Sequence, residues 1–265
     1  MTGFEKIFFH NNLGRRLAGR IYSTGQRSDV AVIFSHGLFS SKDGYKITRL
    51  ADAIVATGLP LMTFDFSFAG ESEGNISDLS TLQEVEDLAS AIRWAGNQGW
   101  QKVHLIGSSM GASVTLLYGS RNEPGVESLV LIATPVDLRR LALDGMGLTA
   151  AEIDMLPEEG FQNIDGIEIS NSFFRELALI DIPEAARKIG LPVLSFHGGR
   201  DSVVDPSNIV LLGKNLAGPL KKVIIDDGDH NLTRDKDIAL MKDAITDWLG
   251  GGYMLLGRSP GENRP

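Results

Sequence analysis

Residues 103–112 read Val103-His104-Leu105-Ile106-Gly107-Ser108-Ser109-Met110-Gly111-Ala112 and decide the fold. The run begins with apolar residues of strand character, passes through small residues and enters a helical pattern. This strand–turn–helix context is the one in which a Gly-x-Ser-x-Gly motif presents a nucleophilic serine. Gly107 and Gly111 flank Ser109 where any side chain would collide with the neighbouring strand or helix. We therefore predict that Ser109 stands at the carboxyl edge of a sheet, with the backbone N–H of Met110 beside it at a helix N-terminus.

A second copy of the motif occurs in Gly70-Glu71-Ser72-Glu73-Gly74. No strand runs directly into this copy, and no helix pattern begins at its serine. The two glutamates beside Ser72 would oppose an alkoxide, because like charges repel. We expect this copy to be a loop. The alternative interpretation of the Ser109 copy is a glycine-rich turn in a nucleotide-binding fold.

Composition narrows the class of protein. The chain has 265 residues, 43% of them hydrophobic, which suits one α/β domain with an insertion. Its net charge of −9 argues against nucleic acid and anionic membranes as partners. Because the chain has no cysteine, disulfides, thiolate catalysis and cysteine-ligated metals are excluded. Apolar runs fall short of the ~20 residues of a membrane helix and the first residues lack a signal-peptide pattern, so we expect a cytoplasmic protein.

Strand and helix patterns alternate along most of the chain. Apolar runs predict strands over residues 6–10, 17–22, 29–34, 59–66, 126–133, 191–196 and 222–225. Helical patterns cover about 45–57, 206–216 and 235–249, and another begins at Ser80. In that helix Gln83 completes a capping-box pattern, and Leu82, Val85 and Leu88 share an apolar face. Such alternation predicts a mostly parallel sheet with right-handed crossovers.

The alternation breaks between Pro135 and Ala186. An Asp-Gly pair at residues 165–166, between two isoleucines, predicts a hairpin there. We therefore expect a core of residues 1–134 and 187–250, an inserted cap of residues 135–186, and a flexible tail of residues 251–265. The apolar side chains of the cap are Leu141, Met146, Leu148, Met155, Leu156, Phe161, Phe173 and Phe174. Either they form only the core of the cap, or some of them face Ser109 and line a pocket.

A serine nucleophile needs a base, and the chain has five histidines. His10 lies in an early edge strand, His104 lies in mid-strand, and His36 is too close to the expected anion site to act as a free base. His197 ends a strand before two glycines. His230 lies in the loop between the last strand and the last helix, at the edge where catalytic groups of open α/β sheets gather. We predict that His230 is the base; the alternative is a loop histidine that caps a helix.

The orienting carboxylate is predicted to be Asp201, four residues beyond the strand that ends at His197. This choice gives the chain order Ser, Asp, His that the motif predicts. Asp205 precedes a proline at a helix start and is interpreted as a helix cap. Asp137, after an earlier strand, is a further alternative. The aspartates within residues 226–229 would favour the protonated form of the neighbouring histidine if they lie close to it; otherwise they form a solvated acidic loop.

An oxyanion needs two preorganised N–H donors. Met110 supplies one, and Leu38, in the loop after the strand that ends at Ser35, is the candidate for the second. We interpret His36 and Gly37 as structural support, with the glycine permitting a close approach of the backbone.

The chain resembles the α/β-hydrolase fold family. The residues that carry the resemblance are His36-Gly37, Gly107-Ser108-Ser109-Met110-Gly111, His197-Gly198-Gly199-Arg200-Asp201 and Gly228-Asp229-His230. The resemblance implies an eight-stranded sheet and a Ser-His-Asp hydrolase. Within the family, residues 63–74, the acidic amphipathic helix after them and the cap with its hairpin are similar to feruloyl (cinnamoyl) esterases and acylglycerol-lipase-like serine hydrolases.

Together these features predict a serine carboxylesterase that acts on a small-molecule ester and needs no cofactor or metal. Ser109 would attack the carbonyl carbon, His230 would transfer the proton and Asp201 would hold the imidazole. Leu38 and Met110 would stabilise the oxyanion. A thioesterase, a C–C hydrolase, a serine peptidase and a non-catalytic ligand-binding protein of the same fold remain alternatives, and the oligomeric state is left open.

Overall fold

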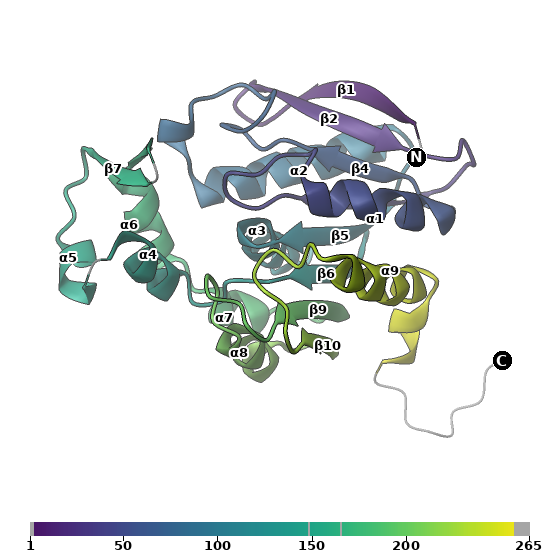
Figure 1. Ribbon diagram of the computed structural model, residues 1–265. Helices are drawn as coiled ribbons and strands as arrows, with labels where there is room; N and C mark the ends of the chain where they lie inside the picture. The colour runs from purple at the N-terminus through teal and green to yellow at the C-terminus, as the bar shows by residue number, and fades with distance from the viewer. Residues whose placement is uncertain (1–2, 148, 165, 257–265) are drawn as a thin grey trace.

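The computed structural model describes residues 3–147, 149–164 and 166–256, and an eight-stranded sheet forms its centre (Figure 1). The strands of this sheet, in chain order, are β1 (Phe4–His10), β2 (Arg16–Tyr22), β3 (Val30–Ser35), β4 (Leu61–Phe64), β5 (Lys102–Ser108), β6 (Val126–Ile132), β9 (Val193–Gly198) and β10 (Leu220–Ile225). Their spatial order is β1-β2-β4-β3-β5-β6-β9-β10. β2 runs antiparallel to both of its neighbours, and the pairs from β4 to β10 are parallel. The mostly parallel sheet predicted from the alternation is therefore confirmed.

Helices cover both faces of the sheet. One face carries α1 (Tyr45–Ala56) and α9 (Asp235–Leu249), which lie side by side in Figure 1. The other face carries α2 (Thr81–Asn97), α3 (Met110–Gly119), α7 (Ile182–Ala186) and α8 (Ser207–Asn215). Two clusters of buried apolar side chains result, one on each face. Since β3, β5, β6 and β9 contribute to both clusters, their near-continuous apolar runs follow from burial on both sides.

The helix α2 differs in detail from its predicted amphipathic face. Leu82 is exposed, whereas Glu84 and Asp87 are buried. The Ser80 hydroxyl accepts the N–H of Gln83, as a cap should, but the Gln83 side chain donates to Asn12 and Asp87 instead of returning to residue 80. The cap is thus one half of a capping box.

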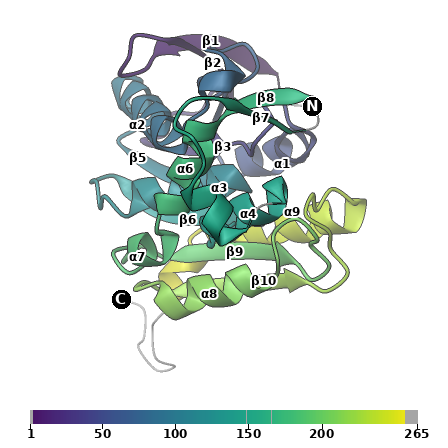
Figure 2. The same ribbon diagram turned by 90° about the vertical axis from the view of Figure 1, so that its left-hand side faces the viewer.

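The segment between β6 and β9 stands at one end of the sheet (Figures 1 and 2). It contains α4 (Leu138–Met146), α5 (Ala150–Asp154), β7 (Phe161–Ile164), β8 (Ile167–Ser170), α6 (Asn171–Leu179) and α7. The strands β7 and β8 form a hairpin in which Ile164 pairs with Ile167, where the sequence predicts one. Phe173 and Phe174 are buried in the same apolar cluster as the core strands, so this segment packs onto the domain instead of standing apart from it.

The last described residues follow α9 as a short 3-10 helix, η2 (Gly252–Leu255). The ring of Tyr253 packs against Trp248, with ring centroids 5.9 Å apart, and against His104 at 5.4 Å. The tail expected from Gly251 onward therefore does not begin there, because an aromatic side chain anchors this turn to the core. The remainder of the predicted tail, residues 257–265, lies outside the described residues, as do Leu148 and the Met146 side chain.

Candidate active site

Ser109 lies in a sharp turn between β5 and α3, with φ 53° and ψ −125°. This left-handed conformation is rare for a residue with a side chain and places the serine at the tip of the turn. A Cβ on Gly111 would collide with the carbonyl oxygens of Ser35 and His36, and one on Gly107 would lie 2.6 Å from the Thr115 hydroxyl. Both glycines are therefore required by the close approach of β3, β5 and α3, which is the reason proposed for them from the sequence.

His230 and Asp201 lie next to Ser109, although they come from different loops. The Ser109 Oγ is 3.0 Å from His230 Nε2, and His230 Nδ1 is 2.8 Å from Asp201 Oδ2. The loop after β10 supplies the histidine and the loop after β9 supplies the aspartate. With its proton on Nδ1, the imidazole donates to the carboxylate and leaves Nε2 free to accept the serine proton. The structure thus brings together all three residues that the sequence selected for catalysis.

Asp201 is held in one orientation by the backbone around it. Its Oδ1 accepts the N–H groups of Val203 at 2.9 Å and Val204 at 2.8 Å, which leaves Oδ2 for His230. Burial opposes ionisation, but the hydrogen bonds from His230 and these N–H groups hold the pKa of Asp201 below its usual value. The carboxylate is therefore charged at neutral pH and can stabilise an imidazolium.

His197 is a neighbour of Asp201 that sequence reasoning left without a role. It is fully buried, and its Nε2 lies 2.9 Å from the Val204 carbonyl oxygen and 3.5 Å from Asp201 Oδ2. By donating to that carbonyl it fixes the turn whose N–H groups orient the aspartate. The sequence feature that could have identified this role is the position of His197 at the end of a strand, four residues before Asp201.

The alternative acids lie in other environments. Asp205 accepts the Ser207 N–H at 2.8 Å, and Asp137 accepts the Arg140 N–H at 2.9 Å, so both act at helix starts. Asp227 is paired with Arg234 and Lys236. Asp229 accepts the Leu232 N–H and Asp226 is exposed, and neither of them forms an ion pair with His230.

The predicted oxyanion donors share a cavity with Ser109. Leu38, in the loop after β3, and Met110, at the first position of α3, both line a cavity that reaches the serine. Neither N–H has a hydrogen-bond partner among the described residues. His36 is buried; its Nδ1–H donates to the Gly37 carbonyl oxygen at 2.8 Å, and its Nε2 accepts the Phe66 N–H at 3.1 Å. Burial lowers the pKa of His36, so a neutral ring ties the loop after β3 to the residues after β4.

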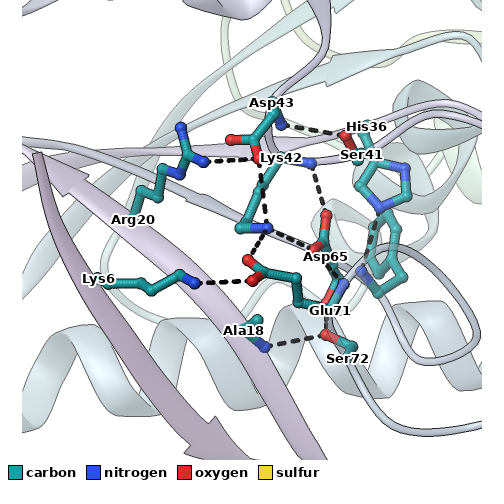
Figure 3. A network of polar contacts seen from close by, with 11 residues as sticks. Lys6, Ala18, Arg20, His36, Ser41, Lys42, Asp43, Asp65, Glu71 and Ser72 are labelled. Carbon is teal, nitrogen blue, oxygen red and sulfur yellow. Dashed lines mark hydrogen bonds and ion pairs between the residues drawn. The ribbon is translucent and has the colours of Figure 1, made fainter.

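A second tie between these loops is a buried ion pair that sequence reasoning missed (Figure 3). The Lys42 ammonium is 2.8 Å from Asp65 Oδ2 and 2.7 Å from Glu71 Oε2, and the Lys42 N–H donates to Asp65 Oδ1 at 2.7 Å. Burial opposes the charge of Lys42, but the hydrogen bonds to these carboxylates raise its pKa. We name Lys42, Asp65 and Glu71 the loop clamp. Ser72, from the second serine motif, donates to the Asp65 carbonyl oxygen and accepts the Ala18 N–H, so that motif is a structural loop as expected.

Two cavities meet at Ser109 and His230. One has a volume of about 320 Å³ and is mainly apolar; the cap residues that line it are Leu141, Ala142, Ile164, Ile169, Phe173, Phe174 and Leu177. The other has a volume of about 230 Å³ and extends toward the start of α1. Lys46 of that helix and Ser108, the last residue of β5, are among the residues that line it. Of the apolar cap residues selected from the sequence, Leu141, Phe173 and Phe174 therefore face the site, whereas Met155 and Phe161 are exposed.

Two further findings on the described residues concern metal binding and membrane crossing. Within residues 3–147, 149–164 and 166–256, no group of three or more His, Asp or Glu side chains is arranged to hold a metal ion. In the same part of the chain, no helix has the length and apolar character that a bilayer crossing requires.

Sequence comparison finds one matching family model and several relatives. A family model described as serine aminopeptidase, S33, matches residues 26–156. The mitochondrial palmitoyl-protein thioesterase ABHD10 of Mus musculus is 26% identical over 224 residues, which cover 82% of this chain and 74% of the relative. An uncharacterized protein of Salmonella typhimurium, YfhR, is 26% identical over 265 residues, which cover 91% of this chain and 82% of the relative.

Solved structures resemble the chain over nearly its whole length. Est1E from Butyrivibrio proteoclasticus, with ferulic acid bound, has a TM-score of 0.82 at 18% identity and covers 92% of this chain and 97% of its own. Alpha/beta hydrolase domain-containing protein 10 from mouse has a TM-score of 0.73 at 23% identity and covers 92% of this chain and 98% of its own.

Proposed function

Because this chain has the α/β-hydrolase fold that its sequence predicts, we propose that it is a serine carboxylesterase acting on small-molecule esters. The observation that carries the proposal is the continuous hydrogen-bonded chain from Ser109 through His230 to Asp201, at 3.0 and 2.8 Å. A nucleophile, a base within hydrogen-bond reach and an orienting acid are the parts that acyl transfer needs. The relative ABHD10 is named a palmitoyl-protein thioesterase, which supports a hydrolase of esters or thioesters.

The proposed reaction has two halves. Ser109 Oγ attacks the ester carbonyl carbon while its proton passes to His230 Nε2, and the N–H groups of Leu38 and Met110 bind the resulting oxyanion. Collapse of this tetrahedral intermediate breaks the C–O bond, and His230 protonates the departing alkoxide. Water, deprotonated by the same imidazole, then attacks the acyl-enzyme. The bond between the acyl carbon and Ser109 Oγ breaks, His230 returns the proton to the serine, and the acid is released. Asp201 remains ionised throughout and stabilises the imidazolium.

The 320 Å³ cavity supports a place for the acyl group. Its walls are mainly leucine, isoleucine and phenylalanine side chains, so burying a medium-length or aromatic acyl group in it is favourable. We therefore propose a preference for such esters over acetate.

The decisive experiment compares the two serine motifs. In Ser109→Ala, release of 4-nitrophenol from 4-nitrophenyl butyrate should fall by roughly 10⁴–10⁶-fold, as in triad knockouts of other serine hydrolases. Ser72→Ala, in the same motif but at a structural loop, is the matched control and should change turnover little. Equal turnover by wild type and a folded Ser109→Ala would disprove the proposal.

Thioester hydrolysis is a second candidate function. It is favoured by the similarity to ABHD10, which is named a palmitoyl-protein thioesterase, and by the apolar cavity beside Ser109. Oxygen ester and thioester can be compared with butyryl esters of one alcohol and of the matching thiol. A kcat/KM for the thioester that exceeds that of the oxygen ester by more than their intrinsic reactivity ratio would assign the chain to thioesterases.

A further inference from the structure

The 230 Å³ cavity opens onto the catalytic pair, and the described residues that line it all lie outside the cap. It is bounded by Ser109 and His230, by the start of α1, and by Asn231 and Thr233 in the loop after β10. If the acyl group occupies the apolar cavity, the bond from the carbonyl carbon to the ester oxygen and its substituent must point in another direction. This second cavity, which also opens onto Ser109 and onto the imidazole that must protonate the alkoxide, is the available space.

Lys46 gives this cavity a positive charge that has no direct ion-pair partner among the described residues, although the charges of Asp201 and Asp229 act on it from farther away. Its ammonium donates to the Ser108 hydroxyl at 2.9 Å. The described residues that line the cavity include no carboxylate. By contrast, a larger hollow of about 660 Å³ between α4 and α8 is lined by four aspartates. In a chain of net charge −9, an ammonium with a neutral partner at the nucleophile is a distinctive feature.

The surroundings of Lys46 favour an anion further. The N-cap of α1, Gly44, has no side chain to accept the first N–H groups of the helix, and the first turn contains no acidic residue. Gly44, Tyr45 and Lys46 all line the cavity, so the positive end of the helix dipole faces the same space as the ammonium. Partial burial lowers the pKa of Lys46 to about 8, against the opposing effect of Asp201 and Asp229, so the group is still mostly protonated at neutral pH.

We propose that the 230 Å³ cavity binds the leaving group of the ester, and that Lys46 recognises an anionic oxygen group, a carboxylate or a phosphate, carried by it. The inference rests on the proposed ester chemistry and deepens it by naming the substrate class. An ammonium facing a carboxylate or phosphate in a partly dehydrated cavity forms a charge-assisted hydrogen bond, which a neutral substituent of the same size cannot replace. The ammonium is thereby a specificity-determining group, with proton transfer left to His230.

The test uses three butyrate esters of substituted phenols that differ only at the 3-position. One carries a carboxylate, one a phosphate and one a neutral carboxamide. For each enzyme, kcat/KM of each anionic ester is divided by that of the carboxamide, and the ratios are compared between wild type and Lys46→Gln. Intrinsic reactivities cancel in this comparison, and the two anionic arms distinguish carboxylate from phosphate. Lys46→Arg serves as the conservative variant.

We expect the kcat/KM ratio of at least one anionic ester to fall roughly tenfold in Lys46→Gln, because KM rises, and to recover in Lys46→Arg.

Arg49→Gln is the control. It removes a positive charge one turn further along α1, from a side chain that is exposed and paired with Asp235. Its ratios should stay within about twofold of wild type, whereas a change shared with Lys46→Gln would point to long-range charge and overturn the inference. Ratios unaltered in Lys46→Gln would overturn it as well. Failure of the proposed function itself is distinguishable, because the carboxamide ester would then be hydrolysed equally by wild type and Ser109→Ala.

Discussion

Asp201 and Asp205 show how partners, and not sequence position, determine the role of a carboxylate. They lie four residues apart in one loop, yet Asp201 is buried against His230 and Asp205 is exposed at the start of α8. Asp201→Asn should lower kcat for ester hydrolysis by about 10³–10⁴-fold, because an amide can neither stabilise the imidazolium nor enforce the productive tautomer. Asp205→Asn should leave kcat within about twofold of wild type. If the Asp205 variant lost more activity while folded, the acid would be misassigned.

Because of Lys46, we expect kcat/KM for anionic and neutral esters to depend differently on pH. Since its pKa is about 8, the ammonium loses its proton as the pH rises through that value, and the preference for an anionic leaving group should fall there. The ratio of kcat/KM for the carboxylate and carboxamide esters should be flat near neutral pH and decline above about pH 8. The other charged or titratable groups near Lys46 are His230, which shares the cavity, Asp201 and Asp229; they act on both esters alike, so their effect cancels in the ratio. A ratio independent of pH from about 6 to 10 would contradict this.

The sequence was sufficient for some of these residues and not for others. Ser109 could be predicted because its glycines and its strand–turn–helix context are local, and His230 and Asp201 because both follow apolar strands in the expected chain order. Lys42 and Lys46 belong to no motif. Their partners are distant in the chain, 23 residues away for Asp65 and 62 for Ser108, and only the pairing of neighbouring strands brings them together.

At the scale of elements, the loop clamp joins the loop after β3 to the loop after β4, beside the link made by His36. Lys42→Met would leave the Asp65 carboxylate buried with backbone N–H donors but no countercharge, so the free energy of unfolding should fall by about 3–5 kcal/mol. Lys6→Met is the matched control: Lys6 contacts the exposed side of Glu71, where removal should cost under about 1 kcal/mol. Urea unfolding of both variants measures the difference. Similar losses in the two variants would show that burial of the ammonium does not matter.

A separate set of hydrogen bonds, made by Asp87, explains why α2 departs from its predicted face. Periodicity placed Leu82 inside, but Asp87 is buried because it accepts the Ser67 N–H and the Asn11 amide, which hold the loop after β4. A hydrogen-bonded carboxylate can occupy a core position that a pattern of apolar residues assigns to leucine or valine. Hydrophobic periodicity therefore located the helix and its start, but not which polar residues it buries.

At the scale of the whole molecule, the site is a product of topology. The parallel strands β3, β5, β9 and β10 all end at one edge of the sheet, so their loops bring Leu38, Ser109, Asp201 and His230 together there. Alternation of strands and helices predicted this edge. It could not predict the arrangement of the cap, whose short elements carry little periodic signal and take their positions from packing against α2 and the core.

The cap is the part of the molecule expected to select the acyl group, and Leu141 tests this with little risk to folding. Leu141 is only partly buried and lines the 320 Å³ cavity with Ser109, whereas Phe173 and Phe174 also belong to the main core. Leu141→Ala removes one wall of the cavity, so kcat/KM for 4-nitrophenyl hexanoate relative to the acetate should fall roughly tenfold. Met155→Ala, in the same cap but 73% exposed, should leave the ratio unchanged. Because acetate has little apolar surface to bury in the cavity, its hydrolysis should persist in both variants and report that the catalytic residues are intact. An unaltered chain-length profile in a folded Leu141→Ala protein would assign acyl selection to the loops of the core.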